Sequence, residues 1–178
     1  GSREVMVATF VEGSLLLAFA ATAVVTGETS LSGMFGGGLS PRWTTAIPSL
    51  VMVGVSLFAA MLAECARVPV DDPATHLELT MIHEVAVLDH SGPDLAFLLY
   101  AASVKLVLLG ALVTGILLPR AELPLASALG GGAVALIAVG AAVGIVESVT
   151  ARSRMPMVPL YLAGSAAFAL IVLALLLR

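Results

Sequence analysis

The stretch LAFLLYAASVKLVLLGALVTGILL, residues 95–118, decides the class of fold, because a lysine is its only charged residue. A helix that crosses the hydrocarbon core of a membrane needs about 20 predominantly apolar residues, and this run is longer. Four further stretches qualify or nearly qualify, at 5–26, 46–63, 126–149 and 158–177. The sequence therefore predicts an all-α fold, a polytopic transmembrane helical bundle of about five spans.

Bulk composition agrees with a membrane protein. Hydrophobic residues make up 60% of the 178 residues, charged residues make up 11%, and the mean hydropathy is +1.09. Soluble domains carry about 25% charged residues, so this chain has too little charge for a soluble surface. The apolar runs are continuous instead of alternating with period two, which disfavours a β-barrel. We therefore expect a single membrane domain over residues 1–178, embedded in the lipid bilayer.

Cysteine content and net charge narrow the function classes. A single cysteine cannot form an intrachain disulfide or supply a cysteine cluster for zinc or iron–sulfur. A net charge of −4 spread over loops argues against a nucleic-acid partner. The Gly-rich connection at 27–45 has no lysine after it and no strand before it, so a phosphate-binding loop is not expected.

The ionisable groups are concentrated in one segment between two apolar runs. Residues 64–90 read ECARVPVDDPATHLELTMIHEVAVLDH and contain six of the twelve acidic residues and every histidine. Because a block so rich in charge cannot lie in lipid, it must form a loop outside the hydrocarbon core. A membrane protein that gathers its ionisable groups in this way offers them to a partner, a proton or a substrate.

Alternation of five spans gives a topology. It places the N-terminus, the loop at 64–93 and the loop at 150–156 on one side of the membrane. That side carries Arg3, Arg67, Arg152 and Arg154, and the other carries Arg42, Arg120 and Arg178. Cytoplasmic loops carry more Lys and Arg, so the loop at 64–93 is expected to face the cytoplasm.

The second half of this loop has the pattern of an amphipathic surface helix. Pro69 and Pro73 disfavour helix before them, so 68–73 is expected to be an extended turn in which Asp72 caps the helix that follows. From 74 to about 88 an apolar stripe is formed by Leu77, Met81, Val85 and Leu88. Within about 100° on the facing side lie His76, Thr80, His83 and Glu84. This polar face is either solvated surface or a face for docking or proton handling.

A metal site on that helix is not expected. His76 and His83 are seven residues apart, which is about 10.5 Å along a helix axis, too far for one ion to bridge.

Four ionisable residues in or at the ends of the spans need an explanation: Glu12, Glu64, Lys105 and Glu147. A lysine near the middle of a membrane costs roughly 2.5–3.5 kcal/mol unless it has a partner or a wet interior. Glu12 or Glu147 is the expected counter-ion of Lys105, although Glu147, at a helix end, could instead reach cytoplasmic water. Arg67 has three acids within five residues, Glu64, Asp71 and Asp72, and is expected to form a bidentate clamp across the turn.

Small residues in the fourth apolar run predict a close helix contact. Gly140 and Gly144 form a small-xxx-small pair, which lets two helix backbones approach each other in a membrane.

The motif Glu64-x-x-Arg67-x-Pro69-x-Asp71-x-Pro73 resembles the signature loop of the NADH dehydrogenase subunit 1 family, the membrane subunit beside the quinone site of respiratory complex I. The residues at 72–84, 2–5 and 146–159 resemble more closely the branch found in membrane-bound nickel–iron hydrogenases, of the formate hydrogenlyase subunit 4 and hydrogenase-4 component C type. Val70 and the residues at 74–75 depart from the respiratory pattern. Family members carry about three more helices before this region, so the chain is expected to be the C-terminal part of a longer protein.

The resemblance implies that the subunit anchors a cytoplasmic redox arm through the loop at 64–93. The implied partners are the hydrogenase large and small subunits, an iron–sulfur subunit and antiporter-like membrane subunits. The nickel–iron centre and iron–sulfur clusters would lie in those partners, with no cofactor, metal or catalytic centre in this chain. The implied coupling loop contains Glu64, Arg67, Asp71, Asp72, His76, Glu78, His83, Glu84 and Asp89. The implied membrane relay contains Glu4, Glu12, Lys105 and Glu147.

Three functions remain open from the sequence. The first is a membrane anchoring and ion-coupling subunit of a membrane-bound hydrogenase complex in a prokaryotic cytoplasmic membrane. The second is the equivalent subunit of an NADH:quinone oxidoreductase, at the quinone site. The third is a free-standing ion transporter, which the spans disfavour because none has paired Gly/Pro interruptions in its middle.

Overall fold

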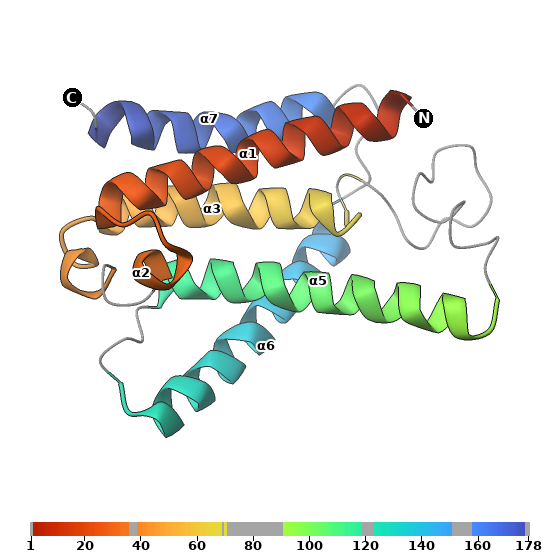
Figure 1. Ribbon diagram of the computed structural model, residues 1–178. Helices are drawn as coiled ribbons and strands as arrows, with labels where there is room; N and C mark the ends of the chain where they lie inside the picture. Colours follow the sequence, from red (N-terminus) through yellow and green to blue (C-terminus); the bar gives the residue numbers. More distant parts are fainter. Residues whose placement is uncertain are drawn as a thin grey trace.

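A computed structural model describes residues 2–35, 39–68, 70, 91–118, 123–150 and 158–176, and every regular element within these ranges is helical (Figure 1). In chain order the elements are α1 (Ser2–Thr26), α2 (Leu31–Phe35), η1 (Ser40–Arg42), α3 (Ile47–Glu64), α5 (Pro93–Leu117), α6 (Leu125–Val149) and α7 (Val158–Leu176). Helices α1, α3, α5, α6 and α7 are long and apolar enough to cross a membrane. The predicted all-α fold with five spans is confirmed.

Prolines mark where two of the spans begin. Pro48 is the second residue of α3 and Pro93 is the first residue of α5. Proline lacks an N–H, and the first turn of a helix has no intrahelical partner for one, so these positions tolerate it. Pro48 therefore lies in the first turn of α3, where it does not break the helix.

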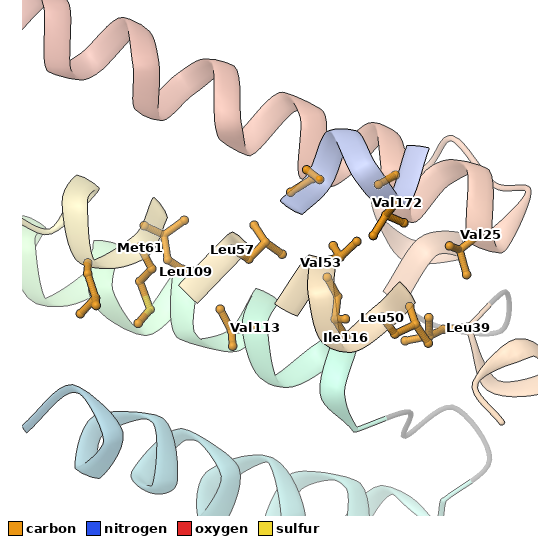
Figure 2. Packing of buried hydrophobic residues seen from close by; sticks show 14 of the residues in the cluster. Val25, Leu39, Leu50, Val53, Leu57, Met61, Leu109, Val113, Ile116 and Val172 are labelled. Atoms are coloured by element: carbon orange, nitrogen blue, oxygen red, sulfur yellow. The ribbon is translucent and has the colours of Figure 1, made fainter. Parts of the chain in front are cut away.

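Three helices form the main packing unit. Helices α1, α3 and α7 lie side by side, α5 packs on α3, and α6 crosses α5 obliquely (Figure 1). Figure 2 shows the seam between α3 and α5, where Val53, Leu57 and Met61 face Leu109 and Val113. All five side chains are buried, so α3 is the central element of the bundle.

Hydroxyl groups join α3 to α7 inside the apolar core. The Ser56 hydroxyl donates a hydrogen bond to the carbonyl oxygen of Ser165 at 2.7 Å, and both residues are buried. The Tyr161 hydroxyl donates to the carbonyl oxygen of Ala59 at 3.3 Å. Small and hydroxyl-bearing residues are typical of helix interfaces in membranes, where lipid gives no hydrophobic drive for helices to associate.

Most residues of helix α6 are exposed. A Cβ added at Gly140 or Gly144 would meet nothing within 4 Å. The close helix contact predicted at these glycines is therefore not made within the part of the chain that the structure describes. The reason is the oblique course of α6, which brings it against α5 through Gly110, whose added Cβ would lie 3.3 Å from Leu136 (Figure 1).

The connection between α1 and α3 is tied down by two side chains. Gly27 ends α1 with a φ of 72°, and the Arg42 guanidinium donates through Nη1 to the carbonyl oxygen of Val25 at 2.7 Å. This bond satisfies one of the carbonyl groups that a helix leaves unpaired at its C-terminus. The Trp43 indole Nε1 donates to the carbonyl oxygen of Ile116 at 3.3 Å, which links the same connection to the end of α5.

We expect Arg42→Met to lower the free energy of unfolding by about 1 kcal/mol, because it removes a charge-assisted bond at a largely exposed site. The thermal unfolding midpoint of the chain in detergent measures this change. Arg42→Lys is the matched control, since it keeps the charge and loses the planar group. A midpoint equal to wild type in Arg42→Met would contradict the capping role.

Candidate ion-coupling site at the end of α3

Helix α3 ends in a tight turn with a left-handed residue. The amide of Arg67 donates to the carbonyl oxygen of Leu62 at 2.8 Å, and the amide of Ala66 donates to that of Ala63 at 3.2 Å. These two bonds define a Schellman motif, whose residue beyond the cap adopts the left-handed conformation and is usually glycine. Here that residue is Ala66, with a φ of 49°.

The carboxylate at the end of α3 pairs with the lysine in the middle of α5. Glu64 Oε1 lies 2.5 Å from Lys105 Nζ, and the two side chains are 26% and 45% exposed. The prediction that Glu12 or Glu147 is the counter-ion of Lys105 was therefore wrong. Lys105 lies twelve residues after Pro93, about 18 Å along α5, and the antiparallel course of α3 and α5 brings the end of α3 to that level.

The arginine in the turn pairs with α6. Arg67 Nη1 lies 3.2 Å from Glu147 Oε1, with the side chains 36% and 28% exposed. The contact joins one pair of atoms, and Arg67 makes no ion pair with Glu64 in the described part of the chain. Glu147 therefore has a protein partner instead of reaching only water. Asp71 and Asp72, the other members of the predicted clamp, lie outside the described residues.

A cysteine lies among these charges. Partial burial raises the pKa of the Cys65 thiol above its usual value of 9.0, while the nearby cations of Lys105 and Arg67 act in the opposite direction. Because the pKa is raised, the thiol stays protonated at neutral pH and reacts slowly with electrophiles. The influence of both cations on Cys65 places the two ion pairs in one electrostatic neighbourhood.

A groove of about 520 Å³ opens beside the Glu64–Lys105 pair, between α1, α3 and α5. Apart from that pair its walls are formed by Leu15, Tyr100, Ala101, Val104, Leu108 and Leu109. Tyr100 was not among the site residues predicted from the sequence. The only signal in the sequence was its place five residues before Lys105 and next to Ala101, which shares the face of Lys105 at a spacing of four residues.

The other predicted site residues are not brought into this cluster. Glu12 is exposed on α1, and no ion pair joins it to another described residue. Glu4 belongs to α1, but its side chain is outside the described part. Also outside the described residues are Asp71, Asp72, His76, Glu78, His83, Glu84 and Asp89. The site that the structure gives is therefore the set Glu64, Arg67, Lys105 and Glu147.

Comparison with known proteins adds one match. A family model described as NADH dehydrogenase matches residues 1–177. Neither the curated proteins nor the solved structures give a match to this chain.

Proposed function

This chain belongs to the NADH dehydrogenase family, and on that premise we propose that it anchors a hydrogenase-type redox arm to the membrane and couples that arm to ion movement. Its family and its five spans make it a multi-pass membrane subunit like those of complex I. The proposal adds the kind of redox arm, the partners and the coupling role.

The coupling role is supported by the four charges at the end of α3. Three apolar helices each bring charge to this place: Glu64 at the end of α3, Lys105 in α5 and Glu147 in α6, with Arg67 from the turn after α3. Ionisable residues in membrane spans are costly, and they commonly mark ion or proton paths. Each cation faces one carboxylate, so a proton that enters or leaves one pair changes the field at the other. This convergence is the observation that carries the proposal.

The hydrogenase arm is supported by sequence. The residues at 72–84 resemble the hydrogenase branch, and Val70 departs from the respiratory pattern. The proposed partners are the hydrogenase large and small subunits, an iron–sulfur subunit and antiporter-like membrane subunits. The nickel–iron centre and the iron–sulfur clusters belong to those partners. In this proposal the loop at 64–93 faces the cytoplasm of a prokaryotic cell and holds the arm.

Purification of the tagged chain from its native membrane in mild detergent tests this assignment. Hydrogenase and antiporter-like subunits should co-purify, and the preparation should oxidise or evolve hydrogen with artificial electron carriers. Purification with subunits that bind NADH would replace the hydrogenase arm by a respiratory one. A chain that purifies alone and moves ions alone would contradict both.

One observation favours the respiratory alternative, the subunit at the quinone site of an NADH:quinone oxidoreductase. The groove beside Glu64 and Lys105 has apolar walls, a tyrosine and an ion pair, which suits a long apolar molecule with a polar head. A photoreactive quinone should label Tyr100 or its neighbours if this alternative holds. If excess unlabelled quinone leaves the extent of labelling unchanged, that result would contradict this alternative.

The docking role of the loop gives a further prediction. We expect His83→Ala combined with Glu84→Ala to leave the subunit in the membrane and to weaken capture of the soluble arm by about tenfold, equivalent to about 1.4 kcal/mol. The amount of arm that co-purifies at increasing dilution measures the change. Glu28→Ala, an exposed change at the other end of the bundle, is the control. Full capture and normal turnover would identify the polar face of 74–89 as solvated surface.

A further inference from the structure

The turn at Ala66 separates two charges that a continuous helix would keep together. Residues three apart on a helix lie on the same face, so Arg67 would follow Glu64 toward the same neighbour if α3 continued. Instead Glu64 pairs with Lys105 of α5, and Arg67 pairs with Glu147 of α6. The single left-handed residue between them, Ala66, changes the direction of the chain.

We infer that Ala66 is a positioning residue whose left-handed backbone sends Glu64 to α5 and Arg67 to α6, so that the two ion pairs form and break together. This deepens the proposed function and rests on it wherever ion movement is the readout. The claim that the turn directs Glu64 and Arg67 to different helices does not depend on ion movement. The hydrogen bonds that the backbone amides of Ala66 and Arg67 donate to the last turn of α3 hold the turn, and with it the positions of Glu64 and Arg67. Loss of these hydrogen bonds releases both side chains.

The identity of residue 66 bears on how firmly the turn is held. The left-handed conformation crowds a Cβ against the backbone, glycine avoids this crowding, and asparagine tolerates it better than other residues. A β-branched residue is the most strongly disfavoured. Alanine at this position therefore gives a turn that its neighbours hold in place against a local preference for other conformations. Such a turn opens more readily than one built on glycine.

The thiol of Cys65 can report the opening of this turn. Cys65 is the only cysteine in the sequence, precedes Ala66 directly and is partly buried beside Lys105 and Arg67. Opening of the turn exposes the thiol to water, so the rate at which a maleimide alkylates Cys65 follows the open fraction. The modified peptide is identified by its mass, which separates it from cysteines of partner proteins.

The experiment compares Ala66→Val, Ala66→Gly and Ala66→Asn in native membranes containing the whole complex. Ala66→Val should raise the alkylation rate of Cys65 several-fold, whereas Ala66→Gly and Ala66→Asn should react at the wild-type rate or more slowly. Equal rates in all three variants would overturn the positioning role. The readout needs no ion movement, so its failure is distinguishable from failure of the proposed function.

A second comparison tests whether the pairs break together and does not depend on the folding of Ala66→Val. Lys105→Met and Glu147→Gln each remove one pair. Loss of the Lys105 cation also raises the pKa of the Cys65 thiol, so the alkylation rates are compared after correction for the thiolate fraction, taken from their pH dependence. If both pairs depend on one turn, each change alone should raise the corrected rate several-fold, and the double variant should react no faster than the faster single one. Multiplication of the two effects in the double variant would show two independent pairs and overturn the inference.

Discussion

Replacing Lys105 with methionine is expected to reduce ion movement linked to turnover by about tenfold or more, which corresponds to about 1.4 kcal/mol in the barrier. The complex should remain assembled and still react with hydrogen through artificial electron carriers. The reason is that Lys105 is the cation that α5 brings to the charge cluster, and methionine of similar length cannot carry a proton. Measurement of pH or potential changes in sealed vesicles, against turnover, checks this result.

Two further variants serve as controls for Lys105→Met. Glu64→Gln removes the partner of Lys105 and should cause a similar loss of ion movement, whereas Lys105→Arg keeps a permanent charge that cannot titrate. Full ion movement in Lys105→Met would contradict a coupling role. If the single variants fail to assemble and the double variant Glu64→Gln with Lys105→Met assembles, the pair is structural, because neither change then leaves a lone charge in the membrane.

Replacing Glu147 with glutamine or Arg67 with glutamine is expected to lower the stability of the assembled subunit by about 1–2 kcal/mol. Either change leaves a partly buried charge without its partner, and the side chains are exposed enough for water to screen part of the loss. The thermal midpoint of the purified complex and its turnover measure the two consequences. The reversed pair, Arg67→Glu with Glu147→Arg, should recover at least part of the stability.

Arg67→Lys tests what the guanidinium does beyond this contact. The structure gives Arg67 a single contact with Glu147, which an ammonium can partly replace. The sequence also predicts a fork across Asp71 and Asp72, which an ammonium cannot form. Loss of turnover in Arg67→Lys would support the fork, and wild-type turnover would remove it. If the variant that combines Arg67→Glu with Glu147→Arg recovers no stability, that result would contradict the ion pair between the turn after α3 and α6.

Most of the fold could be predicted from the sequence because each span is a property of a local run. The runs expected at 46–63 and 126–149 became Ile47–Glu64 and Leu125–Val149. A membrane requires continuous apolar residues over its thickness, so loops rich in charge or proline mark the ends of helices with little ambiguity. Pro93 illustrates this, since it starts α5 two residues before the predicted run.

The ion-pair partners could not be predicted, because they depend on which helices are neighbours and at what level. Lys105 was correctly placed within its span, but its partner comes from the end of α3, a helix seven residues shorter than α5. Glu147 was correctly placed at a helix end. The left-handed turn that directs Arg67 toward Glu147 could not be predicted, because its left-handed residue is an alanine and not a glycine. Periodicity gives the face of a helix and says nothing about the helix that lies opposite.

The packing of α7 has a consequence for biosynthesis. Val158 follows the end of α3 by roughly 90 residues, which a ribosome adds in about 5–20 s at 5–20 residues/s. During that interval α1 and α3 are already available to the membrane, while the surface that α7 covers still faces lipid. The hydroxyl of Ser56 then lacks the acceptor that Ser165 later provides. A nascent chain stalled before α7 would leave this hydroxyl, and the apolar side chains beside it on α3, without the cover that α7 provides.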